Sequence, residues 1–183
     1  MTGHRQIQTL QSKKSGFTIV ELLIVIIVIA ILAAIVIVAY NGIQQKAQQS
    51  KISSDLKAFE KAIHMARTQT GQVLGNITGS FGTAWGCVNE PSGTNLATLP
   101  KTDPCWANYA SALDKISTAG GSNIRNLVDP WGRPYYIDEN EYEGSSTNCT
   151  HDHLGVYPIP TVNGSWGTMS GTDVWVANSM PNC

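Results

Sequence analysis

Residues 17–40 read FTIVELLIVIIVIAILAAIVIVAY, and this stretch decides the fold. Only Thr18 and Glu21 interrupt its run of apolar residues before Tyr40. A helix needs about 20 apolar residues to span the core of a bilayer, and residues 22–40 alone are long enough. The run contains no turn signals, so we predict a membrane-spanning helix rather than a buried strand.

The sixteen residues before the apolar run are polar and include Arg5, Lys13 and Lys14 but no acid. The positive-inside rule therefore places the N-terminus in the cytoplasm and the rest of the chain outside. Without these residues the chain is mildly acidic, and the whole chain has a net charge of −1. This charge argues against a strong nucleic-acid-binding surface.

All four cysteines follow the apolar run: Cys87, Cys105, Cys149 and Cys183. An even number on one side of a membrane segment is typical of disulfides in an oxidising compartment. Three pairings are possible, and we favour Cys87–Cys105 with Cys149–Cys183 because each closes a local loop. Four buried thiols are the alternative.

After the apolar run, residues 43–70 carry apolar side chains at helical spacing, followed by Gly71 as a stop signal. The apolar positions are Ile52, Leu56, Phe59, Ile63 and Ala66. The two stretches together predict one helix of about 54 residues, roughly 80 Å long. Asn41-Gly42 is its weak point, because Gly costs about 1 kcal/mol relative to Ala inside a helix.

The remainder of the chain has the composition of a small α+β head. Residues 72–104 are rich in Gly, Thr, Ser, Asn and Pro and predict a long loop, and residues 106–117 predict a short helix. Candidate antiparallel strands are residues 134–138, 154–158 and 174–177. We therefore predict an α+β fold in which a long N-terminal helix packs on a small antiparallel sheet.

Glu21 is the residue that points most directly to function. An acid inside a membrane helix costs at least about 2.5 kcal/mol on insertion scales, so such residues are functional by default. No basic residue within the apolar run can pair with it. If the chain were cut after Gly16, the new α-amine of Phe17 would lie one helical turn away. It would also lie near Glu21 of a neighbouring subunit, and this charge pair would set the register of stacked chains.

The junction resembles the class III leader of type IV pilins and type II secretion pseudopilins. The matching residues are Lys13-Lys14-Ser15-Gly16 followed by FTIVELLIV at residues 17–25. This resemblance implies that a prepilin peptidase cleaves after Gly16 and methylates the amine of Phe17. It also implies that an inner-membrane assembly platform then draws the helices into a filament core. A plain signal anchor is the alternative.

The resemblance implies a division of the chain into four parts. They are a cleaved leader (1–16), a transmembrane and filament-core helix (17–42), an amphipathic helix (43–71) and an extracellular head (72–183).

A second resemblance lies at residues 129–135, DPWGRPY, which are similar to a segment that leads into the sheet of major pseudopilins and some short pilins. Pro130 and Pro134 fix φ and Gly132 allows a bend. We expect Trp131 and Tyr135 to anchor this turn to the helix. Two features depart from the family: Val38 stands where pilins usually have a Pro, and no clear calcium loop follows the turn.

Two weaker patterns remain. Asp138, Glu139, Glu141 and Asp152 are candidate ligands for Ca²⁺, which prefers oxygen donors, although a solvated hairpin is the alternative. No other cofactor is expected. The five tryptophans are expected to be mostly core residues, with Trp166 as a candidate for an exposed contact.

We therefore predict a structural subunit and not an enzyme. The favoured function is a type IV pilus subunit for adhesion, motility or DNA uptake, first in the cytoplasmic membrane and then in a surface filament. Its partners would be identical or homologous subunits, the prepilin peptidase and the assembly platform. The alternatives are a pseudopilin of a type II secretion system and a membrane-anchored extracellular binding domain.

Overall fold

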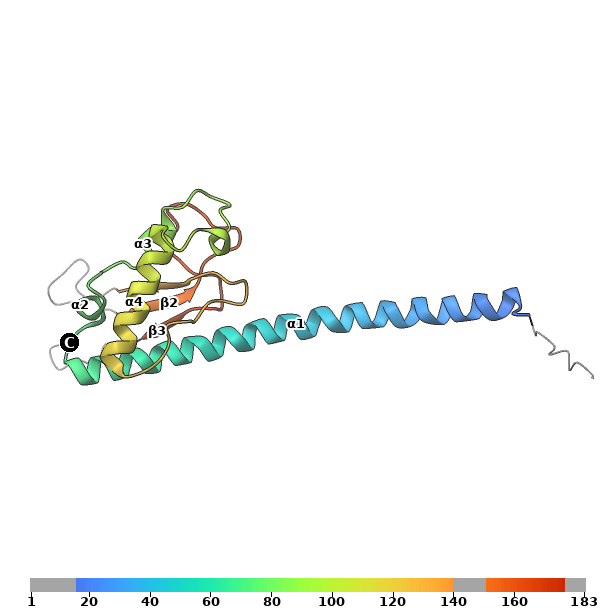
Figure 1. Cartoon of the computed structure of the whole chain (residues 1–183), viewed down its shortest axis with the longest axis horizontal. Helices are drawn as coiled ribbons and strands as arrows, with labels where there is room; N and C mark the ends of the chain where they lie inside the picture. The colour runs from blue at the N-terminus through green and yellow to red at the C-terminus, as the bar shows by residue number, and fades with distance from the viewer. Residues whose placement is uncertain (1–15, 140–150, 177–183) are drawn as a thin grey trace, which may run out of the picture. The chain divides into compact units, whose positions relative to one another are not determined.

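The computed structural model describes residues 16–139 and 151–176. The chain divides into two compact units, and the boundary lies between Gln44 and Gln45. It confirms the predicted α+β class, with a long N-terminal helix followed by a head that contains a small antiparallel sheet (Figure 1). The elements are α1 (Ile19–Thr70), α2 (Leu74–Thr78), α3 (Trp85–Val88), η1 (Leu96–Thr98), α4 (Pro104–Gly120), β1 (Tyr135–Asp138), β2 (Asp152–Val156) and β3 (Val174–Val176).

Helix α1 includes Asn41 and Gly42, as predicted, and ends where Gly71 adopts a positive φ of 67°. The N–H of Gly71 closes the last turn by donating to the carbonyl of Arg67 at 2.8 Å. The five apolar residues predicted for the second part of α1 are all buried, with Phe59 and Ile63 fully inaccessible. The helical spacing therefore identified the face that packs on the head.

The sheet has the order β1-β2-β3, and both pairings are antiparallel. Its apolar residues share one core with α4 and the second part of α1, where Phe59 meets Tyr135 edge-on at 5.5 Å between ring centroids. Strand β2 begins and ends two residues earlier than predicted. Its predicted last residues, Tyr157 and Pro158, lie outside the ladder, and their carbonyls accept hydrogen bonds from Arg133 instead.

Helix α4 is longer at both ends than the sequence predicts. The Asp103 side chain caps its start by accepting a hydrogen bond from the N–H of Cys105 at 2.8 Å, and Pro104 occupies the first turn. At its other end, a Cβ on Gly120 would lie 2.9 Å from the carbonyl oxygen of Ala62. Gly120 therefore allows α4 to approach the backbone of α1 closely.

Two sequence-based expectations about the head were wrong. Residues 72–104 are not one long loop, because they contain α2, α3 and η1. The tryptophans are not mostly core residues, because only Trp106 is buried and Trp85, Trp131 and Trp175 are between 37% and 55% exposed. Trp166, the candidate for exposure, is 45% exposed as expected. The predicted Cys87–Cys105 disulfide is confirmed. Cys149 and Cys183 lie outside the described residues.

Candidate assembly site

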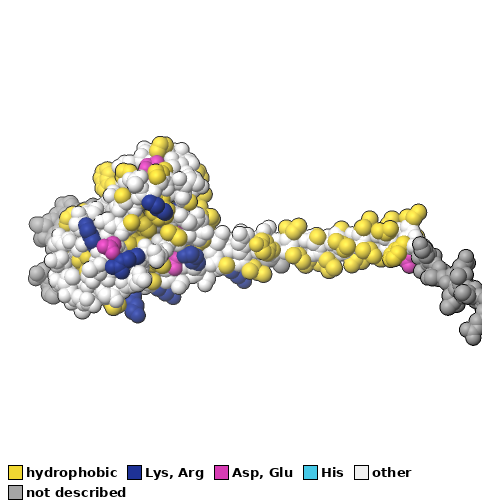
Figure 2. Space-filling model, in the orientation of Figure 1, with side chains coloured by type: hydrophobic (Ala, Val, Ile, Leu, Met, Phe, Trp, Pro, Cys, Tyr) yellow, Lys and Arg dark blue, Asp and Glu magenta, His cyan; other side chains and the backbone are white. Residues whose placement is uncertain are grey.

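The described part of the first unit has its large apolar side chains exposed. Every large hydrophobic side chain from Ile19 to Ile43 whose exposure is described is between 49% and 84% exposed. An 18-residue window of α1 has a mean hydropathy of 3.7, so the helix is long and apolar enough to cross a membrane. Figure 2 shows hydrophobic side chains along this stretch. A helix that is apolar all round requires apolar surroundings, which a bilayer or a bundle of such helices supplies.

Glu21 has a local partner that the sequence reasoning missed. Both the N–H and the hydroxyl of Thr18 donate to its Oε2, at 2.9 and 2.7 Å, and the N–H of Glu21 donates to the Thr18 Oγ1 at 3.3 Å. Since Ile19 begins the helix, this is a capping box with Thr18 as N-cap. The T-x-x-E spacing was visible in the sequence. The box satisfies groups at the helix start that an apolar environment would otherwise leave unpaired.

The residues of the expected cleavage site precede the first turn of α1. Gly16 and Phe17 are both outside regular structure and exposed, Phe17 at 81%. A Cβ on Gly16 would meet nothing within 4 Å. The junction is therefore accessible, while Lys13, Lys14 and Ser15 lie outside the described residues.

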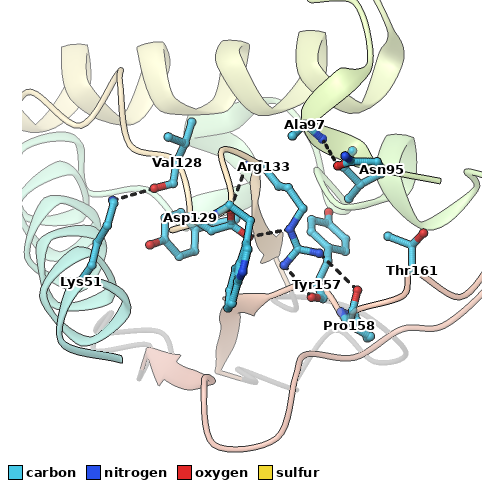
Figure 3. Close-up of polar contacts among 12 residues, drawn as sticks. Lys51, Asn95, Ala97, Val128, Asp129, Arg133, Tyr157, Pro158 and Thr161 are labelled. Atoms are coloured by element: carbon cyan, nitrogen blue, oxygen red, sulfur yellow. Dashed lines mark hydrogen bonds and ion pairs between the residues drawn. The ribbon is translucent and has the colours of Figure 1, made fainter. Parts of the chain in front are cut away.

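The DPWGRPY segment forms a tight turn at the start of β1 (Figure 3). Asp129 Oδ1 accepts from the backbone N–H groups of Trp131 and Arg133, at 2.9 and 2.8 Å. Gly132 adopts a φ of 78°, and its N–H donates to the carbonyl of Asp129 at 3.0 Å. The Asp and Gly positions therefore have definite structural roles in the turn.

Arg133 joins this turn to the end of β2. Its Nε donates to Asp129 Oδ2 at 2.7 Å, and both side chains are buried. Its remaining nitrogens donate to the carbonyls of Tyr157 and Pro158, at 3.0 and 3.3 Å. The buried charge is therefore paired and hydrogen-bonded, as a low-dielectric interior requires.

The turn is anchored to α1 through Tyr135, as expected. The Tyr135 hydroxyl donates to Asp55 Oδ2 at 2.7 Å, and Lys51 of the same helix donates to the carbonyl of Val128 at 2.7 Å. Burial, followed by the hydrogen bond to Asp55, raises the pKa of Tyr135, so the hydroxyl stays protonated and keeps donating. Trp131 remains 37% exposed, and the Arg133 guanidinium lies 5.3 Å from its ring centroid.

The candidate calcium ligands have other partners where they are described. Asp138 accepts from the Tyr136 hydroxyl at 3.0 Å, Glu139 accepts from the N–H of Thr83 at 2.8 Å, and Asp152 is paired with Arg67. Within residues 16–139 and 151–176, no three His, Cys, Asp or Glu residues are grouped as metal ligands. Glu141 lies outside the described residues.

A family profile and similar protein sequences identify the family of this chain. The family profile described as "Prokaryotic N-terminal methylation motif" matches residues 11–37, which include Gly16, Phe17 and Glu21. Type II secretion system core protein G of Aeromonas hydrophila is 30% identical over 126 residues, covering 68% of this chain and 73% of that protein. The chain belongs to the type IV pilin and pseudopilin family.

A second relative agrees with this assignment. Type II secretion system core protein G of Klebsiella pneumoniae is 28% identical over 126 residues, covering 68% of this chain and 74% of that protein. No solved structure matches the chain significantly.

Pilins and pseudopilins are structural proteins, so this family member is not an enzyme. Membership implies processing by a prepilin peptidase and polymerisation, and the motif with its apolar helix implies an inner-membrane precursor.

Proposed function

We propose that this protein is a pseudopilin, a structural subunit of a filament that serves a type II secretion system. The supporting observation is the similarity to two core G proteins over 126 residues. Helix α1 has 52 residues, so a match of this length extends well into the head, whereas the leader alone would suit any pilin. The sequence alone favoured a pilus subunit, and this similarity favours the alternative.

The proposed assembly chemistry uses Gly16, Phe17 and Glu21. Prepilin peptidase would cut after Gly16 and methylate the new amine of Phe17. In the described residues, the hydrogen bonds that Glu21 accepts from Thr18 all end on Oε2. Its Oε1 is therefore available to the amine of its own or a neighbouring chain, and pairing of opposite charges in an apolar bundle would fix the axial offset between subunits.

The secretion function is tested by deleting the gene in the source bacterium and restoring it on a plasmid. Mass spectrometry of culture supernatants would measure exported proteins, and shearing would recover surface filaments. We expect the deletion to abolish export of a set of folded proteins while surface pili and twitching persist. Normal export together with lost surface filaments would instead identify a pilus subunit.

The assembly chemistry is tested separately with Glu21→Ala. Removing one partner of a buried charge pair costs about 3–5 kcal/mol, so filament yield should fall at least about 100-fold. The precursor should still be cut, which N-terminal mass analysis would detect as a chain beginning at methylated Phe17. Glu60→Ala, which removes an acid from the second part of α1, is the matched control and should assemble normally. Wild-type filament yield from Glu21→Ala would refute the charge-pairing account.

A further inference from the structure

Two of the exposed tryptophans form a corner on the surface of the head. Trp85 and Trp166 are 54% and 45% exposed, and their ring centroids are 4.7 Å apart with an interplanar angle of 76°. Two adjacent indoles left in water are unusual, because Trp normally contributes its large apolar surface to a core. The corner is therefore a candidate binding surface.

Trp85 is held in place by its neighbours. A Cβ on Gly82 would lie 2.1 Å from Trp85 Cδ1, so the indole rests directly on the Gly82 backbone. Immediately before Trp85, the N–H of Ala84 donates to the carbonyl of Ile137 in β1 at 2.9 Å. Two residues after it, Cys87 is joined by the disulfide to Cys105 at the start of α4. These contacts fix the short helix that carries the ring.

The loop that carries Trp166 is held by hydrogen bonds to the last residue of α3 and to the segment that follows α3. Asn163 makes most of these bonds: its N–H donates to Ser92 Oγ at 3.0 Å, and its side-chain amide donates to the carbonyls of Asn89 and Glu90. The N–H of Gly164 donates to the carbonyl of Val88 at 2.9 Å. The segments that carry both rings are therefore fixed before a ligand binds, which reduces the entropy cost of binding.

The two segments that carry the corner are almost free of charged residues. Residues 81–94 and 159–167 contain a single charged side chain, Glu90, together with several Asn, Ser and Thr residues. These segments offer no cation to bind phosphate, nucleic acid or an anionic lipid. Amides and hydroxyls can instead exchange hydrogen bonds with the hydroxyls of a neutral ligand.

The size of the corner favours a small ligand over a protein. An aromatic side chain buries at most about 250 Å², so the two half-exposed rings by themselves provide the contact area of a small ligand and not the roughly 1,000 Å² of a specific protein interface. A pyranose ring suits the corner, because its C–H face can stack on the electron-rich face of an indole while its hydroxyls point to the polar rim.

We propose that the Trp85–Trp166 corner binds neutral hexopyranose units of a glycan. The disulfide and the membrane-inserted precursor place the head outside the cytoplasm, where polysaccharide is exposed to it. This binding is a separate activity from polymerisation and does not depend on which kind of filament the protein builds.

The test uses the full chain in a zwitterionic detergent without a sugar headgroup, because alkyl glycosides would compete. Cellohexaose, chitohexaose and maltohexaose are titrated by calorimetry, and saturation-transfer NMR identifies the sugar protons in contact. We expect at least one to bind with a Kd on the order of 1 mM or tighter. Trp85→Ala and Trp166→Ala should each weaken binding at least about tenfold, in keeping with the loss of one stacking ring.

Trp175→Ala is the matched control. Trp175 is 55% exposed on β3 and stacks on His153 with centroids 4.1 Å apart, so it is a comparable indole outside the corner. Its loss should leave glycan binding unchanged. Gly82→Ala provides a second test, because it should displace the Trp85 ring without removing it and should also weaken binding.

Three results would overturn the glycan site: no binding of any of the three sugars, equal loss of binding in Trp175→Ala, or unchanged binding in Trp85→Ala and Trp166→Ala. Binding of a proline-rich peptide or a second copy, with no sugar binding, would assign the corner to a protein partner and also refute the proposal. Near-UV circular dichroism confirms that each variant is folded. Filament yield should stay normal in Trp85→Ala and Trp166→Ala, which separates this proposal from the assembly chemistry.

Discussion

The two parts of α1 are both helical but differ in the solvent exposure of their apolar side chains. In the first unit, Ile29 is 59% exposed, and its apolar neighbours are exposed to a similar degree. In the second unit, Phe59 is fully buried against the head. The first part depends on apolar surroundings supplied from outside, and the second part is stabilised by the protein's own core. The second part of α1 therefore needs no apolar surroundings from outside the protein.

The largest expected contrast comes from truncating one apolar side chain in each unit. Phe59→Ala should lower the free energy of unfolding of the head by about 3–5 kcal/mol, because it removes a fully buried ring and leaves a cavity. Ile29→Ala should change it by less than about 0.5 kcal/mol. Urea unfolding of the full chain in detergent, followed by near-UV circular dichroism, measures both. Equal destabilisation would mean that the two units do not unfold independently.

A second contrast compares a buried ion pair with an exposed one inside the head. Asp129→Ala should cost about 3 kcal/mol, because it leaves the buried Arg133 charge unpaired and removes the acceptor for two backbone N–H groups. Asp114→Ala breaks the exposed pair with Arg125 and should cost less than about 1 kcal/mol. Thermal unfolding of both variants measures the difference. Similar losses would contradict the structural role given to the DPWGRPY turn.

The smallest expected effect is a pH dependence confined to the head. Burial raises the pKa of Glu139 to about 7, against the lowering effect of its hydrogen bonds from Thr83. The folded state therefore holds this proton more tightly than the unfolded state, and stability should fall as the pH rises from about 4.5 to 7. Relative to Glu139→Gln, the wild type should lose on the order of 2 kcal/mol between pH 5 and pH 8.

Urea unfolding of the wild type and of Glu139→Gln at pH 5 and pH 8 measures this loss of stability. Other titrating groups, such as His153, are present in both proteins, so their contributions cancel in the comparison. A parallel pH dependence of the two proteins would mean that Glu139 does not take up its proton on folding.

Sequence reasoning worked best where the governing interactions are local. The span of α1 followed from an apolar count and helical spacing, and the Cys87–Cys105 bond followed from the short loop that it closes. The capping box of Thr18 and Glu21 was equally local, and only the T-x-x-E spacing needed to be noticed. The short helices α2 and α3 were missed because a segment rich in Gly, Ser and Pro carries no helical periodicity.

The exposure of Trp85, Trp131 and Trp175 was not predicted, since hydrophobicity favours burial and says nothing about which rings the packing leaves outside. The leader could not distinguish a pilin from a pseudopilin, because both groups share it.

The sequence by itself determined that this protein has a membrane-length helix with an acid near its start and that all of its cysteines follow this helix. The helix follows from hydrogen bonds within one segment and from side-chain solvation. Only the tertiary structure decided which polar groups are buried together and which aromatic rings meet. Glu139 accepts a hydrogen bond from Thr83, 56 residues earlier in the chain, and the ring of Trp85 contacts that of Trp166. Both contacts form because packing of the head brings distant segments together. Such contacts depend on the whole arrangement of α4, the sheet and their loops, so no local pattern encodes them.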